Sequence, residues 1–169
     1  MGTVRVLGID PGTAVVGFGV VEAGTAGVPG RLIECGALRT PARDALAARL
    51  HVIHQGIHEL ITRHQPDVIA VETVFYGTNV RTTVALAQAR GVILLAAEQS
   101  ALPIAEYTPA TIKQTVVGRG AARKPQVGYM VAQLLRLKTA PTPSDAADGV
   151  AVALTHLLRS SRIPLRVTR

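Results

Sequence analysis

Val4-Arg5-Val6-Leu7-Gly8-Ile9-Asp10-Pro11-Gly12 is the stretch of sequence that decides the fold. Val4 to Ile9 is a mostly apolar run suited to a central strand, and Asp10-Pro11-Gly12 is a turn signal that ends it. We therefore predict a buried first strand with a carboxylate at its end.

Two further strands are predicted directly after this one. Apolar residues alternate with glycines over residues 15–21, and residues 32–38 form another strand-like run after a glycine-rich turn at 23–30. Because these connections are too short for a crossover, the three strands are expected to form an antiparallel meander.

The chain then changes to strand–helix units. Thr40-Pro41 matches a helix N-cap followed by proline at the first helical position. Apolar residues then recur at steps of four and three over residues 46–61, which predicts an amphipathic helix that ends at Gln65-Pro66. Residues 68–71 predict a fourth, buried strand leading into Glu72.

The rest of the chain continues this pattern. Residues 78–100 have a helical pattern rich in small residues, residues 104–107 predict a fifth strand, and a last helix is expected over residues 144–159. Residues 160–169 are expected to form a flexible basic tail. The fold class is therefore α/β, a mixed five-stranded sheet with helices on both faces, and we expect residues 1–169 to form a single domain.

Charge is distributed unevenly along the chain. The formal net charge is +7, yet residues 1–106 hold eight basic and nine acidic side chains, whereas residues 107–169 hold ten basic and only two acidic ones, Asp145 and Asp148. A basic segment of this kind is typical of a protein that binds a phosphate backbone, although a merely basic surface is about equally common. Two carboxylates retained there suggest a task that needs oxygen ligands, such as holding a divalent metal.

The cellular compartment is predicted from the signals that the sequence lacks and from its cysteine content. The amino terminus has no basic segment followed by a signal-like apolar one, and no uncharged apolar run approaches the roughly 18 residues of a bilayer span. Cys35, the one cysteine, excludes an internal disulfide and a cysteine metal cluster. We expect a cytoplasmic protein without a membrane segment.

Four acidic residues are predicted at the ends of elements that can meet. Asp10 and Glu72 follow strands, and sites in open α/β sheets gather at strand ends. Asp145 and Asp148 are three residues apart in the first turn of a helix, so they share one face near the positive end of the helix dipole. Taken singly, Asp10 suits an ordinary turn, and Glu72 or Asp145 suits a cap or an ion pair.

Four convergent carboxylates would repel one another unless a cation intervenes. Mg²⁺ suits such a site because it prefers hard oxygen ligands. Two such ions supply what hydrolysis of a phosphodiester needs, with one generating hydroxide and the other stabilising the leaving oxygen. No side-chain nucleophile is then required.

These motifs resemble the RuvC-type Holliday-junction resolvases, which belong to the RNase H-like nuclease superfamily. The similarity covers residues 4–158, and its matching stretches are Gly8-Ile9-Asp10-Pro11-Gly12, Ala70-Val71-Glu72 with Phe75, Gln88-Ala89-Arg90-Gly91-Val92, Lys113-Gln114-Thr115-Val116-Val117-Gly118 and Asp145-Ala146-Ala147-Asp148. Thr73 departs from the family pattern, which commonly has glutamine after the catalytic glutamate.

The resemblance implies an RNase H-like fold and a crossover junction endonuclease. It implies a homodimer that binds a four-way DNA junction, nicks two opposed strands symmetrically in recombination and repair, and works with a branch-migration helicase complex. It further implies that the four acids bind Mg²⁺, with Mn²⁺ as a substitute, that Lys113 and Lys124 contact phosphate, and that Phe75 lies beside the junction centre.

The residues themselves support some of these roles. Phe75 and Tyr76, two of only five aromatic residues, follow the candidate glutamate and are of a type that stacks on bases, although Phe75 also suits a core. Arg119, Arg123 and the two lysines flank a glycine-containing loop that suits DNA binding or a solvated surface. The small-residue helix suits a dimer contact or core packing equally well.

Other assignments compete with these. His51, His54 and His58 share a helix at spacings of three and four, but a solvated polar face explains them better than a metal site. Alternative functions are an RNA-processing nuclease of the same superfamily, a sugar-kinase-like ATPase and a DNA-binding protein without activity. The ATPase needs a second nucleotide-binding half that 169 residues do not easily supply.

Overall fold

One five-stranded sheet crosses the computed structural model, which describes residues 3–24, 28–74 and 79–160. Its strands are β1 (Arg5–Asp10), β2 (Val15–Ala23), β3 (Gly30–Arg39), β4 (Val68–Glu72) and β5 (Ile104–Tyr107). They lie in the order β3-β2-β1-β4-β5, with β1, β2 and β3 antiparallel and with β1, β4 and β5 parallel. The predicted meander and mixed sheet are confirmed.

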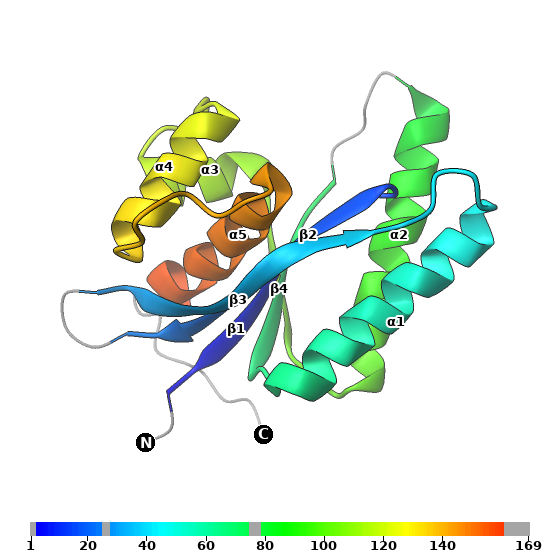
Figure 1. Ribbon diagram of the computed structural model, residues 1–169, viewed down its shortest axis with the longest axis horizontal. Coiled ribbons are helices and arrows are strands. Elements are labelled where there is room, and N and C mark those ends of the chain that lie inside the picture. The colour runs from blue at the N-terminus through cyan, green and yellow to red at the C-terminus, as the bar shows by residue number, and fades with distance from the viewer. Residues whose placement is uncertain (1–2, 25–27, 75–78, 161–169) are drawn as a thin grey trace.

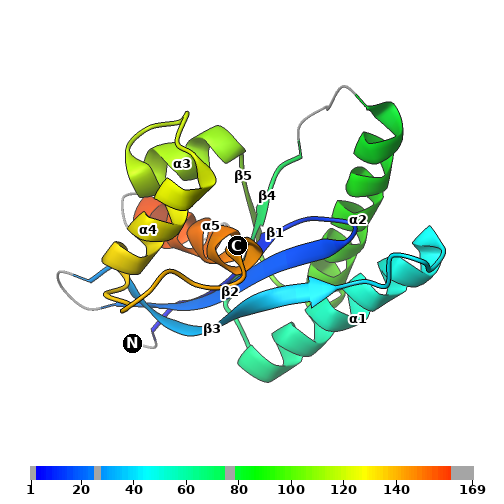
Figure 2. The ribbon, with the colours of Figure 1, turned by 45° about the horizontal axis from the view of Figure 1, so that its top comes forward.

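Five helices cover both faces of this sheet. Helices α1 (Leu46–His64) and α2 (Val80–Gln99) lie on one face, and α3 (Pro109–Val117), α4 (Lys124–Leu134) and α5 (Ser144–Ser160) lie on the other (Figures 1 and 2). Along β1 the side chains alternate, so that Val6 packs in the α5 layer while Leu7 and Ile9 pack in the α1 layer. All three are fully buried, which makes β1 the centre of the core.

The predicted start of α1 is wrong. The helix begins at Leu46, and its N-cap position, Ala45, makes no side-chain cap. The Thr40 hydroxyl instead donates to the carbonyl oxygen of Thr13 at 2.7 Å, so Thr40 ties the β1–β2 turn to the end of β3. The residue that matches an N-cap motif in the sequence thus makes a long-range hydrogen bond instead, to a carbonyl 27 residues earlier in the chain.

Helix α2 bears on the expectation that the chain has no membrane segment. In the described part of the chain it is the one helix long and apolar enough to cross a bilayer. Its most apolar 18 residues have a mean hydropathy of 1.3, and 22% of them are buried. Length and composition alone are weak evidence for a span, and α2 packs against α1 over the sheet. Three of its apolar residues, Val80, Val84 and Leu95, are exposed.

Candidate active site

Asp10 and Glu72 lie side by side because their strands are parallel neighbours. Ile9 of β1 pairs with Val71 of β4, and each carboxylate is the next residue and the last of its strand. Parallel strands end at the same edge of a sheet, so the predicted meeting of these two acids at a strand edge is realised.

Glycines bring α5 against the sheet. Gly17 of β2 pairs with Asp10 across the ladder, and a Cβ on Gly17 would overlap the carbonyl oxygen of Asp145. Gly8 and Gly19 also have no room for a Cβ against the α5 backbone, nor does Gly149 against the backbone of Phe18. This close approach sets the first turn of α5 beside the end of β1.

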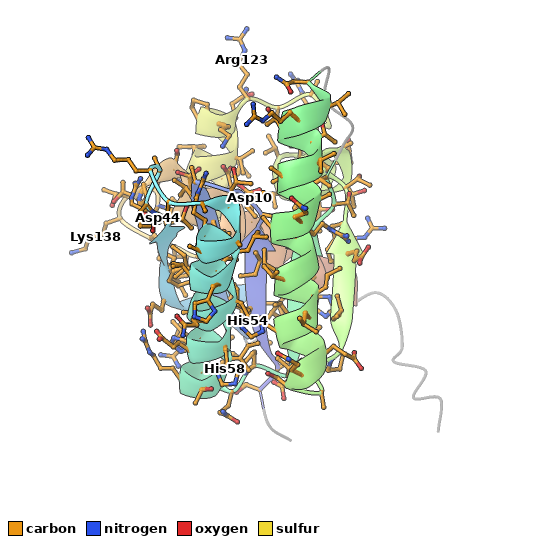
Figure 3. The ribbon with its side chains drawn as sticks, turned by 90° about the vertical axis from the view of Figure 1, so that its right-hand side faces the viewer. Asp10, Asp44, His54, His58, Arg123 and Lys138 are labelled. Carbon is orange, nitrogen blue, oxygen red and sulfur yellow. The ribbon has the colours of Figure 1, made fainter. Side chains whose placement is uncertain are left out.

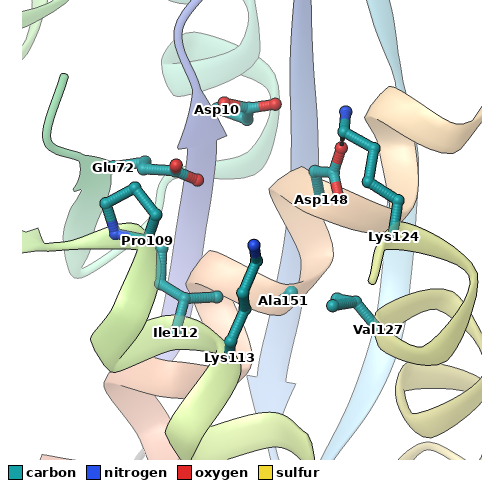
Figure 4. Close-up of a pocket in the computed structure, with 9 residues that line it drawn as sticks. All are labelled: Asp10, Glu72, Pro109, Ile112, Lys113, Lys124, Val127, Asp148 and Ala151. Atoms are coloured by element: carbon teal, nitrogen blue, oxygen red, sulfur yellow. Dashed lines mark hydrogen bonds and ion pairs between the residues drawn. The ribbon is translucent and has the colours of Figure 1, made fainter. Parts of the chain in front are cut away.

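Three aspartates therefore converge. Asp10, Asp145 and Asp148 each offer a carboxylate oxygen, and these oxygens all lie within 4.8 Å of one another. Glu72 lines the same pocket as Asp10 and Asp148, opposite α5 (Figure 4). Hard oxygen donors at this spacing fit a divalent cation of the Mg²⁺ type.

The electrostatics of this cluster oppose ionisation. Burial, with smaller contributions from the charges of Asp148 and Asp145, raises the pKa of Asp10 from 3.8 to about 7. Burial, followed by Asp10 and Asp148, raises the pKa of Glu72 from 4.5 to about 8. A bound cation would offset this repulsion, so the protein alone leaves the cluster short of positive charge.

Two lysines supply part of that charge. Lys124, the first residue of α4, places its Nζ 2.6 Å from Oδ2 of Asp148 and lowers the pKa of both Asp10 and Glu72. Its hydrogen bond to Asp148 raises the pKa of the Lys124 ammonium in turn. Lys113 of α3 points into the pocket from the other side and also lowers the pKa of Glu72 (Figure 4).

The pocket has a volume of about 190 Å³ and an apolar floor. Sequence reasoning missed its apolar lining, which consists of Pro109, Ile112, Val127 and Ala151. Ile112, Val127 and Ala151 are buried helix residues, and no sequence signal distinguishes a core position that also borders a pocket.

Arg119 and Arg123, also predicted to bind DNA, do not line this pocket. Arg119 and Arg123 are exposed on the α3–α4 loop, and Arg123 points away from the body of the protein (Figure 3). Phe75 and Tyr76 lie outside the described residues, as do residues 161–169 of the predicted tail.

The histidine face of α1 is polar and open. His51 and His58 are exposed, and His54 donates from Nε2 to Oε1 of Gln99 on α2 at 2.8 Å (Figure 3). With Gln55 and Glu59, these residues line a second hollow of about 450 Å³. In the described part of the chain, only the aspartate cluster brings three or more ligand atoms within 4.8 Å of one another, and the histidines do not.

Comparison with known proteins decides the family. The family model for crossover junction endodeoxyribonuclease RuvC matches residues 6–156. The chain belongs to the RuvC family. It is 50% identical to the RuvC of a Parafrankia species over 158 residues (92% of this chain and 86% of the relative). It is 51% identical to the RuvC of Moorella thermoacetica over 151 residues (89% of each chain).

Solved structures agree with this assignment. The structure of Thermus thermophilus RuvC superposes with a TM-score of 0.85 at 34% identity, covering 94% of this chain and 96% of that one. The same RuvC in complex with a Holliday junction substrate superposes with a TM-score of 0.87 over the same shares. The RNase H-like fold expected of the RuvC family is thus confirmed.

Proposed function

We propose that this chain is a metal-dependent endonuclease that resolves four-way DNA junctions by paired symmetric nicking in recombination and repair. The observation that carries the proposal is the convergence of Asp10, Glu72, Asp145 and Asp148 at one sheet edge. Relatives of this chain are crossover junction endodeoxyribonucleases, and Thermus thermophilus RuvC forms a complex with a Holliday junction.

The four acids would hold two Mg²⁺ ions, with Mn²⁺ as a substitute. Support comes from the aspartate oxygens within 4.8 Å of one another and from the raised pKa values of Asp10 and Glu72, because both indicate a site completed by a cation. Such ions supply a hydroxide nucleophile and stabilise the leaving oxygen.

The lysines act on the scissile phosphate. Lys113 and Lys124 approach the carboxylates from α3 and α4, so a phosphate drawn into the pocket would meet an ammonium on either side. Together they neutralise charge that develops on the phosphate oxygens.

The DNA surface extends beyond the pocket. Arg119 and Arg123 on the exposed loop beside α4 are positioned to bind the backbone of a junction arm, where they supply affinity without sequence preference. We assign stacking at the junction centre to Phe75 and Tyr76 from their chemistry alone.

A homodimer accounts for the surface of α2. Val80, Val84 and Leu95 are 74%, 51% and 49% exposed, and exposed Ala87 and Gly91 continue the same helix face. A Cβ on Gly91 would meet nothing within 4 Å, so this face is open in the single chain. Unpartnered apolar stripes of this kind mark protein contacts, and a second copy would set two active sites on one junction.

Three further expectations remain part of the proposal. The chain acts in the cytoplasm, as expected from the sequence. It forms a single nuclease domain, since all five strands of the described residues belong to one sheet. It cooperates with a branch-migration helicase complex, for which the family resemblance is the support.

One incubation tests the central claim. The protein is mixed with a mobile four-way junction, a linear duplex or an RNA–DNA hybrid, in Mg²⁺ or EDTA, beside Asp10→Asn and Asp145→Asn variants. We expect paired symmetric nicks on the junction only, lost in EDTA and in both variants. Cleavage of the hybrid instead would favour an RNA-processing nuclease, and junction binding without cleavage in Mg²⁺ or Mn²⁺ would refute the catalytic assignment.

A further inference from the structure

A single charged side chain on α1 holds the turn that follows Asp10. Residues 11–14 connect β1 to β2, and the Arg49 Nη2 donates to the carbonyl oxygen of Thr13 in this turn at 2.6 Å. The Arg49 Nε donates to the Thr40 hydroxyl at 3.0 Å, and that hydroxyl donates to the same Thr13 carbonyl at 2.7 Å. The three groups form a closed polar triangle.

The triangle joins three segments that are far apart in the sequence. Thr13 belongs to the β1–β2 turn, Thr40 directly follows β3, and Arg49 lies in the first turn of α1. The backbone N–H of Thr40 also donates to the carbonyl oxygen of Ala14 at 3.0 Å, which extends the β2–β3 ladder into the turn. Thr40 is 8% exposed, so its bonds are largely protected from water.

The positive charge of Arg49 is electrostatically unfavourable at its position in α1. A cation in the first turn of a helix opposes the helix dipole, and α1 has no acidic residue there to compensate. Within the described residues Arg49 makes no ion pair, and its two bonds go to uncharged oxygens of the turn and of Thr40. The guanidinium therefore stabilises the β1–β2 turn rather than α1.

Its effect on Asp10 passes through the backbone. The charges that shift the pKa of Asp10 are those of Asp148, Lys124 and Asp145, and Arg49 is not among them. The turn has little freedom of its own, since a Cβ on Gly12 would overlap the carbonyl oxygen of Val15. Fixing Thr13 thus fixes the path of the chain directly after Asp10.

We propose that Arg49, with Thr40, is a positioning residue. It holds the β1–β2 turn, residues 11–14, so that the carboxylate of the preceding Asp10 meets the aspartates of α5. The proposal rests on the assigned metal site. Mg²⁺ demands near-octahedral geometry at short bond lengths, so a small displacement of one carboxylate weakens binding. Loss of groups that orient metal ligands typically costs about 10–100-fold in metal affinity or activity.

Four variants test this on the whole protein. Arg49→Met keeps the length of the side chain and removes its donors, and Arg49→Lys keeps the charge but cannot bridge two oxygens. Thr40→Val removes the hydroxyl, whereas Thr40→Ser keeps it. Arg63→Met is the control, because Arg63 also lies on α1 but pairs with Glu34 away from the turn.

The readouts are Mn²⁺ binding to the free protein by calorimetry, the Mg²⁺ concentration for half-maximal junction cleavage, junction affinity in EDTA, and the melting temperature. For Arg49→Met and Thr40→Val we expect metal binding about tenfold weaker and a matching rise in the Mg²⁺ requirement, with junction affinity unchanged. Arg49→Lys should be intermediate, and Thr40→Ser and Arg63→Met should match the wild type.

Several results would overturn the proposal. One is unchanged Mn²⁺ binding in folded Arg49→Met and Thr40→Val, even if the melting temperature falls, because Arg49 would then only stabilise the fold. Another is weaker junction binding with normal metal binding, which would make Arg49 a DNA contact. If the wild type binds Mn²⁺ but cuts no junction, the proposed function fails while the metal titration still tests Arg49.

Discussion

Gly17 lies where any side chain would collide with the carbonyl oxygen of Asp145. Gly17 pairs with Asp10 across the β1–β2 ladder, so the missing side chain leaves room for the first turn of α5 beside the end of β1. The glycine in β2 and the aspartates of α5 are thus parts of the same site, although well over a hundred residues separate them.

Replacing Gly17 with alanine should disrupt the metal site. The added methyl meets backbone rather than a movable side chain, so α5 must shift, with a cost to stability of about 1–3 kcal/mol. We expect Mn²⁺ affinity, measured by calorimetry, to fall about 10–100-fold. Gly128→Ala on α4 is the matched control, since its new methyl meets only ordinary contacts at 3.6 Å and 3.8 Å. Equal metal binding by the two variants would contradict the role given to Gly17.

The stability of the metal-free protein should fall as the pH rises. Asp10 and Glu72 have ordinary pKa values of 3.8 and 4.5 but about 7 and about 8 in the folded protein, so between these limits the folded state binds protons that the unfolded chain has released. The free energy of unfolding therefore falls from about pH 4 to about pH 8. Each unit of pKa difference between the folded and unfolded states corresponds to about 1.4 kcal/mol of this free energy.

Urea unfolding in EDTA at about pH 5.5 and about pH 8.5 measures this loss. Because other groups titrate as well, the comparison is with the Asp10→Asn/Glu72→Gln double variant, which should lose less stability over the same interval. An identical pH dependence in both proteins would show that the two acids are not the cause.

Removing Lys124 should shift the pH dependence of metal binding upward. Lys124 lowers the pKa of Asp10 and of Glu72, so Lys124→Met raises both, and more alkaline pH is needed to deprotonate the ligands. Junction cleavage should also fall about a hundredfold through loss of charge at the phosphate. Lys138→Met, an exposed lysine outside the pocket, is the control for net charge. An unshifted Mn²⁺ titration in Lys124→Met would separate Lys124 from the carboxylates.

A charge on the exposed face of α2 should produce a monomer. Leu95 is 49% exposed and Val84 is 51% exposed, so Leu95→Lys and Val84→Glu leave the core intact while placing charge in the proposed dimer contact. Sedimentation velocity should show the wild type as a dimer and both variants as folded monomers with paired nicking lost. Val4→Lys, at a residue 39% exposed just before β1, should remain a dimer. A monomeric wild type would refute the dimer itself.

Sequence pattern alone located most of the elements and placed four acids at element ends. Apolar runs and turn signals located the strands closely, and the fifth strand matched residue for residue, because alternation and strand length are local properties. Asp10, Glu72, Asp145 and Asp148 were found as carboxylates at element ends. The start of α1 was misplaced because Thr40-Pro41 has the local chemistry of a cap, whereas its hydroxyl bonds the turn after Asp10.

The sequence by itself determined the order of strands and helices along the chain, the positions of the four acids, and the basic charge of residues 107–169. Only the tertiary structure decided how these parts meet: that Gly17 lets Asp145 approach Asp10, that Lys124 pairs with Asp148, and that Arg49 reaches the turn after Asp10. The physical reason is the range of the interactions involved. Secondary structure follows from neighbours in the chain, whereas close backbone approach, ion pairs and buried hydrogen bonds depend on distances that only the packed sheet and helices set.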